Sequence, residues 1–157
     1  MNIPLIDFEI ALNKAQKYCA YQERCQWDIE KKFRDWQVDE EIRDEVLAEL
    51  ITRGFVNEER FASHFASGRF RIKQWGKQKI KIELKKRQIS SYSINKALGN
   101  IEDEEYRLTL LSLIAKKSRE VRAKNDFEKT QKIAQYLFSR GYETELIWET
   151  LRIVENE

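Results

Sequence analysis

The chain has 157 residues, enough for one domain or for several small repeated units in one body. Hydrophobic residues make up 41% of the chain and aromatic residues 11%, which excludes an intrinsically disordered protein. Charged residues reach 36% and proline occurs once, so the composition predicts a helical, elongated molecule with much of its surface in solvent.

The net charge of +2 conceals a strongly basic segment in the middle of the chain. Between residues 69 and 87 the only acidic residue is Glu83, whereas in the rest of the chain 26 acidic residues outnumber 20 basic ones. The basic residues of this segment are Arg69, Arg71, Lys73, Lys77, Lys79, Lys81, Lys85, Lys86 and Arg87. A local cluster of one sign sets the field around it, so the segment points to an anionic partner.

The sequence also indicates where the protein is located and which state its cysteines adopt. It contains no apolar run that could cross a membrane and no signal peptide pattern at its N-terminus, so we expect a cytoplasmic protein without a membrane anchor. Cys19 and Cys25 do not form a CxxC motif, and the single histidine, His64, cannot complete a usual zinc site with them. We interpret both cysteines as reduced thiols rather than a disulfide or a redox switch.

Three helices are predicted in the first 55 residues. Asp7 is a candidate N-cap for the first helix, which runs through Cys19, and the second begins near Trp27. The third follows the acidic run 39–41, and Gly54 suits the left-handed position just after its end.

A row of apolar positions that crosses a helix, a turn and a second helix then recurs twice. The first copy comprises Ile29, Phe33, Trp36, Val38, Ile42, Val46 and Leu47. A shift of 51 residues gives Ile80, Leu84, Arg87, Ile89, Ser93, Ala97 and Leu98, and a further 53 residues give Ile133, Leu137, Arg140, Tyr142, Leu146, Thr150 and Leu151. One register held through two helices is difficult to obtain by chance, although Ser93 and Thr150 weaken it.

The recurrence predicts an all-α, elongated fold of three tandem three-helix repeats, with about nine helices and no sheet. Each later copy needs a preceding helix, and we expect these from Glu58 to about Lys73 and from Glu104 to about Lys124. The expected units are residues 1–55, the basic unit 56–101, and 102–157. The alternation at residues 70–73 resembles a strand, but no partner strand of similar quality exists.

No catalytic constellation is visible, and we expect neither an enzyme nor a cofactor or metal. The sequence lacks the phosphate-binding, dinucleotide-binding, hydrolase and metalloprotease motifs. The acidic runs 39–41 and 102–105 precede predicted helices, so capping and the helix dipole explain them. His64 is interpreted as a polar-face or partly buried histidine, because it has no partners for acid–base chemistry.

The basic segment contains a predicted helix that starts near Gly76. A period of 100° per residue places Ile80, Leu84 and the stem of Arg87 on one buried stripe. Lys77, Lys81 and Lys85 form the neighbouring row, and Lys79 and Lys86 lie roughly opposite the stripe. Like charges four residues apart repel each other, which favours a binding surface over a merely solvated face. Phe70 and Trp75 beside these cations are candidates either for stacking on nucleic-acid bases or for the core.

Three motifs resemble the RecX regulators of bacterial recombination over nearly the whole chain. They are Arg53-Gly-Phe-Val-Asn-Glu-Glu-Arg-Phe-Ala62, then Phe65-x3-Arg69 with Gly76-x3-Ile80-x2-Glu83-Leu84-x4-Ile89, and Gln131-Lys-Ile-x2-Tyr-Leu-x2-Arg-Gly-Tyr142. The chain departs from the family pattern at Asn57-Glu58, where an Asp-Asp pair is common, and at Gln88, where a glycine is common. It departs again at Cys25, where a serine often caps the second helix.

The resemblance implies a non-enzymatic regulator that binds the RecA recombinase filament on single-stranded DNA. It further implies inhibition of ATP hydrolysis and strand exchange, with effects on DNA repair and the SOS response. Contact with DNA would be weak and mainly electrostatic, and the protein is expected to be a monomer. The alternative is a helix-turn-helix-like regulator that acts on DNA directly, although the basic helix offers few base-reading side chains apart from Gln74 and Gln78.

Overall fold

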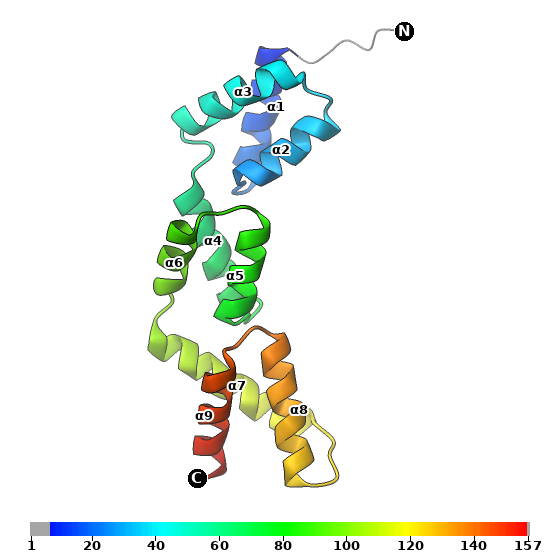
Figure 1. Ribbon diagram of the computed structural model, residues 1–157, viewed down its shortest axis with the longest axis vertical. Coiled ribbons are helices and arrows are strands. Elements are labelled where there is room, and N and C mark those ends of the chain that lie inside the picture. The colour runs from blue at the N-terminus through cyan, green and yellow to red at the C-terminus, as the bar shows by residue number, and fades with distance from the viewer. Residues whose placement is uncertain (1–6, 157) are drawn as a thin grey trace.

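The computed structural model describes residues 7–156, and this part of the chain forms nine α-helices and no β-strand. The helices are α1 (Phe8–Tyr21), α2 (Gln26–Asp35), α3 (Glu40–Thr52), α4 (Glu58–Arg71), α5 (Lys77–Lys86), α6 (Ser91–Gly99), α7 (Asp103–Glu120), α8 (Asp126–Ser139) and α9 (Thr144–Glu155). The chain runs from one end of an elongated molecule to the other (Figure 1). The predicted all-α, elongated fold is confirmed.

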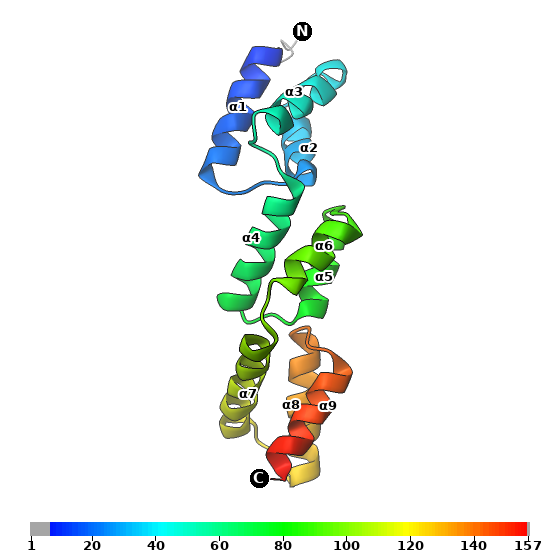
Figure 2. The same ribbon diagram turned by 90° about the vertical axis from the view of Figure 1, so that its left-hand side faces the viewer.

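Each set of three consecutive helices forms one unit along the long axis (Figures 1 and 2). The second helix of each unit carries two apolar side chains four residues apart that are buried: Ile29 and Phe33 in α2, Ile80 and Leu84 in α5, Ile133 and Leu137 in α8. The residue that follows the turn after each of these helices, Val38, Ile89 or Tyr142, is buried as well. The recurrence in the sequence therefore corresponds to three copies of one helical unit.

The two polar interruptions of the apolar row are accommodated by hydrogen bonds. Ser93 and Thr150 are both buried. The Ser93 hydroxyl donates to Oε2 of Glu58 at 2.9 Å, and the Thr150 hydroxyl donates to the carbonyl oxygen of Leu146 at 2.7 Å. A buried hydroxyl with a partner avoids the cost of an unsatisfied polar group, so both residues fit the core that the row predicts.

The repeats do not have three separate cores. The first repeat has a core of its own, built around residues such as Leu12, Phe33 and Leu50. The second and third repeats share one continuous core. Cys25 of the first repeat is part of this core, and Trp27 of the first repeat packs against it. The second and third repeats are therefore joined more extensively than the first and second.

Most helices begin at a side chain that accepts a backbone N–H. The caps of this kind are Asp7, Asp39, Asn57, Ser90 and Asn125, which precede α1, α3, α4, α6 and α8. The N–H of Cys25, which precedes α2, donates to the Asp28 carboxylate at 3.0 Å. The capping roles expected for Asp7 and for the acidic run 39–41 are thus confirmed, whereas α5 begins at Gly76 with no side-chain cap.

Some predicted boundaries differ from the structure. Helix α7 ends at Glu120 rather than near Lys124, because the backbone of Val121 is extended and its side chain packs against the shared core. The alternation at residues 70–73 is not a strand, since Phe70 and Arg71 are the last residues of α4. Gly54 adopts the predicted left-handed conformation, with φ of 80°.

Cys19, Cys25 and His64 were considered for chemical roles, but within residues 7–156 they form neither a disulfide nor a metal-ligand set. Burial raises the pKa of the Cys19 thiol to about 11 and that of the Cys25 thiol to about 12, and the two are unpaired. Such thiols are protonated and unreactive at neutral pH. Within residues 7–156, no three His, Cys, Asp or Glu side chains gather into a metal-ligand set, and His64 is exposed on α4.

No helix within residues 7–156 has the length and apolar character that a membrane crossing requires.

The turn after the second helix of each repeat requires a left-handed residue. Gln37, Gln88 and Gly141 occupy this position, with φ of 58°, 60° and 100°. This conformation costs a residue with a side chain about 1–2 kcal/mol, and glycine loses about 0.5–1 kcal/mol in chain entropy. We therefore expect Gln37→Gly to raise the free energy of unfolding by about 0.5–1 kcal/mol in urea titrations.

The same substitution at Gln131, an exposed residue inside α8, is the matched control. It should lower the free energy of unfolding by up to about 1 kcal/mol, because glycine is a poor helix former. If both substitutions destabilise the protein equally, the backbone at residue 37 is not strained.

Candidate functional site

The half-buried ring of Trp75 lies at the centre of the basic segment, between α4 and α5. The Lys79 ammonium lies 4.5 Å from a Trp75 ring centroid, the Arg69 guanidinium 5.3 Å and the Lys73 ammonium 5.7 Å. Cation–π contacts of this kind are worth about 0.5–1 kcal/mol at exposed sites. Trp75 thus gathers three of the nine predicted cations, while Phe70, the other candidate for stacking, is buried in the core.

The first turn of the basic helix α5 is capped by the third repeat. The N–H of Gly76 donates to the carbonyl oxygen of Arg140 at 2.8 Å, and the N–H of Gln78 donates to that of Gly141 at 2.9 Å. Between them, the N–H of Lys77 donates to the Tyr106 hydroxyl at 2.8 Å. Helix N-termini expose N–H groups that need partners. Here the neighbouring repeat supplies all three.

Two glycines make this close approach possible. A Cβ atom on Gly76 would lie 2.3 Å from the carbonyl carbon of Gly141, and a Cβ atom on Gly141 would lie 2.3 Å from the Cβ of Lys79. Neither distance is compatible with a side chain. Only glycine therefore lets the turn after α8 reach the N-terminus of α5.

Two buried tyrosines complete the contact. The Tyr106 hydroxyl donates to Oε1 of Glu143 at 2.5 Å while it accepts from Lys77, and the Tyr142 hydroxyl donates to the carbonyl oxygen of Gln74 at 3.0 Å. Burial, and then the hydrogen bond to Glu143, raise the pKa of Tyr106 far above its ordinary value. The hydroxyl stays protonated, so it can donate to Glu143 and accept from α5 at once.

The outer face of α5 carries lysines without acidic partners. Lys85 and Lys86 are exposed and Lys81 is half-buried. None of the three forms an ion pair with another described residue. Ile80 and Leu84, on the inner face of the same helix, are fully buried as predicted. This outer lysine face is the part of the predicted site that is most open to a partner.

Three further cations of the predicted site are engaged with the third repeat. Arg71 lies 3.5 Å from the Glu105 carboxylate, and Lys77 lies 3.9 Å from the Asp103 carboxylate. Lys77 also lies over the Tyr106 ring, and Lys79 packs against the glycine turn after α8. The third repeat thus covers the side of the first turn of α5 on which Lys79 lies, so Lys79 is half-buried.

Arg69 and Arg87 belong to the junction between the first and second repeats. The Arg87 guanidinium donates to the Glu83 carboxylate at 3.0 Å, which lowers the pKa of Glu83. It also lies 4.8 Å from the Phe65 ring and 5.7 Å from the Trp27 ring. Arg69 lies 4.6 Å from the Phe65 ring. Lys73 lines the same junction as Arg69 and Arg87, so the nine predicted cations divide between two junctions and the outer face of α5.

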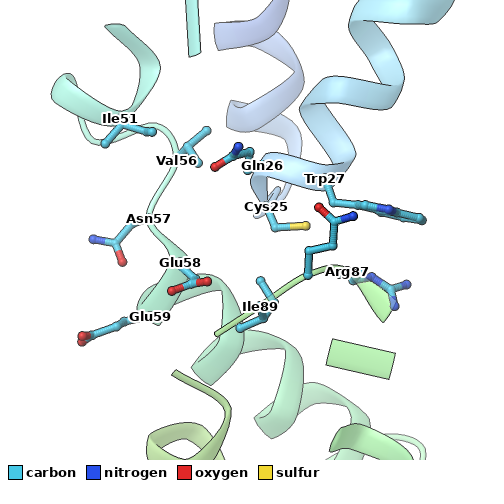
Figure 3. Close-up of a pocket in the computed structure, with 11 residues that line it drawn as sticks. Cys25, Gln26, Trp27, Ile51, Val56, Asn57, Glu58, Glu59, Arg87 and Ile89 are labelled. Carbon is cyan, nitrogen blue, oxygen red and sulfur yellow. The ribbon is translucent and has the colours of Figure 1, made fainter. Parts of the chain in front are cut away.

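The junction between the first and second repeats is open, because it lacks the backbone contact that joins the second repeat to the third. At the repeat intervals of 51 and 53 residues, Cys25 corresponds to Gly76 and Gln88 to Gly141. The N–H of Cys25 donates to Asp28 and not to the carbonyl oxygen of Arg87, and the N–H of Trp27 does not donate to the carbonyl oxygen of Gln88. Cys25 and Gln88 border a cleft of about 650 Å³, whose walls carry Trp27 and Arg87 on one side and Ile51 and Asn57 on the other (Figure 3).

One ion pair crosses this open junction. The Arg60 guanidinium of α4 donates to the Glu23 carboxylate of the first repeat at 2.6 Å and to the carbonyl oxygen of Gly54 at 2.9 Å. A pair this exposed typically contributes only about 0–1 kcal/mol. The first repeat is therefore held to the second less firmly than the third is.

The residues that join the second and third repeats were not predicted from the sequence. A helix was expected to start near Gly76, and Gly141 was noted only as part of a family motif, so the two were not brought together, and Tyr106 and Glu143 were given no role. The available signal was a pair of glycines. Gly76 stands just before the second helix of one repeat, and Gly141 stands just after the second helix of the next repeat, so the two face each other when the repeats are adjacent. Tyr106 and Glu143 gave no signal of this kind.

The fold and surface define a class: an all-helical, tandem three-helix repeat protein whose middle repeat is basic. Residues 11–50, 57–98 and 103–151 match the descriptions "RecX, first three-helix domain", "RecX, second three-helix domain" and "RecX, third three-helix domain". The chain belongs to the RecX family.

Curated relatives agree with this assignment. The chain is 28% identical over 145 residues to the regulatory protein RecX of Chlorobium phaeobacteroides, covering 92% of this chain and 93% of that relative. It is 26% identical to the regulatory protein RecX of Leuconostoc citreum and 24% identical to that of Bacillus cytotoxicus, and covers 56% and 53% of their lengths. The chain thus spans about half the length of the Leuconostoc and Bacillus relatives.

Solved structures have the same fold. The crystal structure of RecX from Lactobacillus salivarius superimposes with a TM-score of 0.85 at 22% identity, covering 96% of this chain and 97% of that one. A second crystal structure, of a regulatory protein RecX, gives a TM-score of 0.81 at 21% identity and covers all of this chain and 81% of that one. At these identities the likeness shows the architecture alone.

The glycine contact predicts a large effect from a small substitution. Gly141→Ala would place a Cβ atom against Lys79 and strain a backbone with φ of 100°. We expect the free energy of unfolding to fall by about 1–3 kcal/mol, which is typical of an overpacked contact. Urea unfolding followed by circular dichroism measures this change.

Gly68→Ala is the matched control, because Gly68 lies inside α4 and a Cβ atom there meets nothing within 4 Å. This substitution should leave the stability unchanged or raise it by up to about 1 kcal/mol. A Gly141→Ala protein as stable as the wild type would mean that the turn after α8 is not packed against α5.

Proposed function

We propose that this protein is a non-enzymatic regulator that binds the RecA recombinase filament on single-stranded DNA and inhibits its ATP hydrolysis and strand exchange. It would thereby modulate recombinational repair and the SOS response from the cytoplasm, acting as a monomer. The curated relatives carry the name regulatory protein, which supports a regulatory role. A filament on DNA offers phosphates and protein carboxylates, which are the groups that the basic middle repeat would attract.

The observation that carries the proposal is the outer lysine face of α5, formed by Lys81, Lys85 and Lys86. Ile80 and Leu84 already anchor this helix in the core, so the three lysines are not needed to bury it. Lys81 and Lys85 are four residues apart on one side of the helix and repel each other by about 0.2–0.5 kcal/mol. A surface that carries unpaired like charges at some cost in stability is typical of one that meets an anionic partner.

The elongated shape supports a groove-binding mode. The three repeats lie end to end, with α5, the helix that carries the outer lysine face, in the middle repeat (Figures 1 and 2). Such a molecule could follow a groove with its central repeat against phosphates or acids and its outer repeats along the walls. Direct reading of duplex DNA by α5 has less support, because Gln78 is the only amide side chain that α5 carries.

Charge reversal on the outer lysine face tests the proposal. The variant Lys81→Glu, Lys85→Glu, Lys86→Glu should lose inhibition of recombinase ATP hydrolysis on single-stranded DNA. Folding should be retained, because Lys85 and Lys86 are exposed and Lys81 is only half-buried, and surface substitutions usually change stability by only about 0.5 kcal/mol each. Lys77 is left unchanged because it contacts Asp103 and Tyr106.

The matched control reverses three exposed acids of α3: Glu40→Lys, Glu41→Lys and Glu45→Lys. This variant should inhibit as the wild type does. A folded lysine-reversal variant that still inhibits at moderate salt would contradict the proposal. Binding of that variant to random-sequence duplex DNA without recombinase would then test the helix-turn-helix-like alternative.

A further inference from the structure

Besides the cleft that Cys25 and Gln88 border, a cationic hollow lies at the junction of the first and second repeats. It has a volume of about 280 Å³ and is lined by the connection between α1 and α2, by Asp28 of α2, by one face of α4 and the residues that follow it, and by the residue that follows α5. Its basic side chains are Arg24 from the first repeat and Arg69, Lys73 and Arg87 from the second. The hollow therefore unites cations from two repeats, and Arg24 lies outside the basic segment of the sequence.

Both acids that line the hollow accept hydrogen bonds from groups other than its cations, although Oε2 of Glu23 is buried without a partner. Glu23 accepts from the Arg60 guanidinium at 2.6 Å. Asp28 accepts from the backbone N–H of Cys25 at 3.0 Å and from its thiol at 3.3 Å. Neither carboxylate forms an ion pair with a cation of the hollow among the described residues. The four cations of the hollow thus outnumber its two lining acids, and among the described residues Arg87 is the only one of the four in an ion pair, with Glu83.

Two of the arginines, Arg24 and Arg69, are held in place by aromatic rings rather than by carboxylates. The Arg24 guanidinium lies 3.7 Å from the Tyr18 ring, and its Nε donates to the carbonyl oxygen of Tyr18 at 3.2 Å. The Arg69 guanidinium lies 4.6 Å from the Phe65 ring, and its Nε is buried without a hydrogen-bond partner. Stacking fixes the plane of a guanidinium and leaves its edge N–H groups able to donate. Arg69 forms no ion pair with another described residue, so its charge is available to an external anion.

We propose that this hollow, defined by Arg24, Arg69, Lys73 and Arg87, is a phosphodiester-binding site for the backbone of single-stranded DNA. The planar guanidinium groups match phosphate oxygens. Lys73, which is exposed and lies on the side of Trp75, provides a route from the hollow toward the basic segment. A bound strand would pass from the second repeat to the first and bridge the open junction. This inference rests on the proposed function and adds the first repeat to the nucleic-acid interface.

The test measures binding of a fluorescent oligothymidylate by anisotropy across a salt series. Arg24→Gln should weaken binding several-fold, and it should reduce the slope of log K against log salt by about 0.7, the value for one lost phosphate contact on a single strand. Arg24→Lys should restore part of the affinity and most of the slope. The matched control is Arg34→Gln, an exposed arginine of α2 outside the hollow, which should change neither quantity. Circular dichroism confirms that each variant is folded.

Arg69→Lys gives an independent check, because it keeps the charge but removes the guanidinium edge. It should also weaken binding several-fold, with little change in the salt slope. Wild-type affinity and slope in both Arg24→Gln and Arg69→Lys would overturn the proposal. So would a wild-type protein that does not bind the oligonucleotide in the absence of recombinase.

The lysine-reversal variant of α5 in the same assays separates this proposal from the proposed function. If that variant loses inhibition of ATP hydrolysis while Arg24→Gln and Arg69→Lys both bind DNA as the wild type does, the phosphate site is rejected and the proposed function stands. If Arg24→Gln weakens DNA binding but the lysine-reversal variant still inhibits, the hollow binds phosphate and the proposed function is rejected.

Discussion

The structure depends on the backbone contact between the start of α5 and the turn after α8. Helix α5 has neither a capping side chain nor an acid in its first turn, and it begins with Lys77 instead. The positive end of a helix dipole is destabilised by nearby cations. The carbonyl oxygens of Arg140 and Gly141 offset this cost, because they bring the negative end of α8 against the positive end of α5. A neighbouring repeat thus allows a strongly basic sequence to form a helix.

This contact divides the molecule unequally. The second and third repeats share a core and a buried hydrogen-bond network around Tyr106, so they form one unit. The first repeat has its own core and meets the second across a cleft, with the Arg60–Glu23 pair and the ring of Trp27 as links. The basic surfaces follow this division: the outer lysine face lies on the firmly joined unit, and the cationic hollow lies at the open junction.

The sequence predicted the fold because the fold rests on local signals that repeat. The burial of Ile80 and Leu84 follows from helical periodicity, and the caps at Asp7 and Asp39 follow from residue type and position. Contacts between repeats could not be predicted in this way. Gly76 and Gly141 are 65 positions apart in the sequence, and each alone is typical of an ordinary helix end.

The candidate site was predicted as a charge cluster but not as a surface. The prediction rested on charge alone and therefore gave all nine cations the same role. In the structure they have different surroundings. Lys77 and Arg71 face acids of α7, Arg87 pairs with Glu83, and Lys85 remains exposed. Burial and pairing depend on how the repeats stack, which periodicity does not specify. For the same reason Arg24, which is far from the cluster in sequence, was not recognised as part of a cationic hollow.

Amide hydrogen exchange at the first turn of α5, measured by NMR on the full chain, tests the central claim most directly. The N–H groups of Gly76, Lys77 and Gln78 should be protected from exchange as strongly as amides in the middle of α5. Each of the three donates a hydrogen bond to an oxygen atom of the third repeat. The exposed first-turn amide of Glu40 in α3 provides the internal reference for rapid exchange. Exchange of the three α5 amides at the rate of Glu40 would contradict the account, since the basic helix would then begin without help from its neighbour.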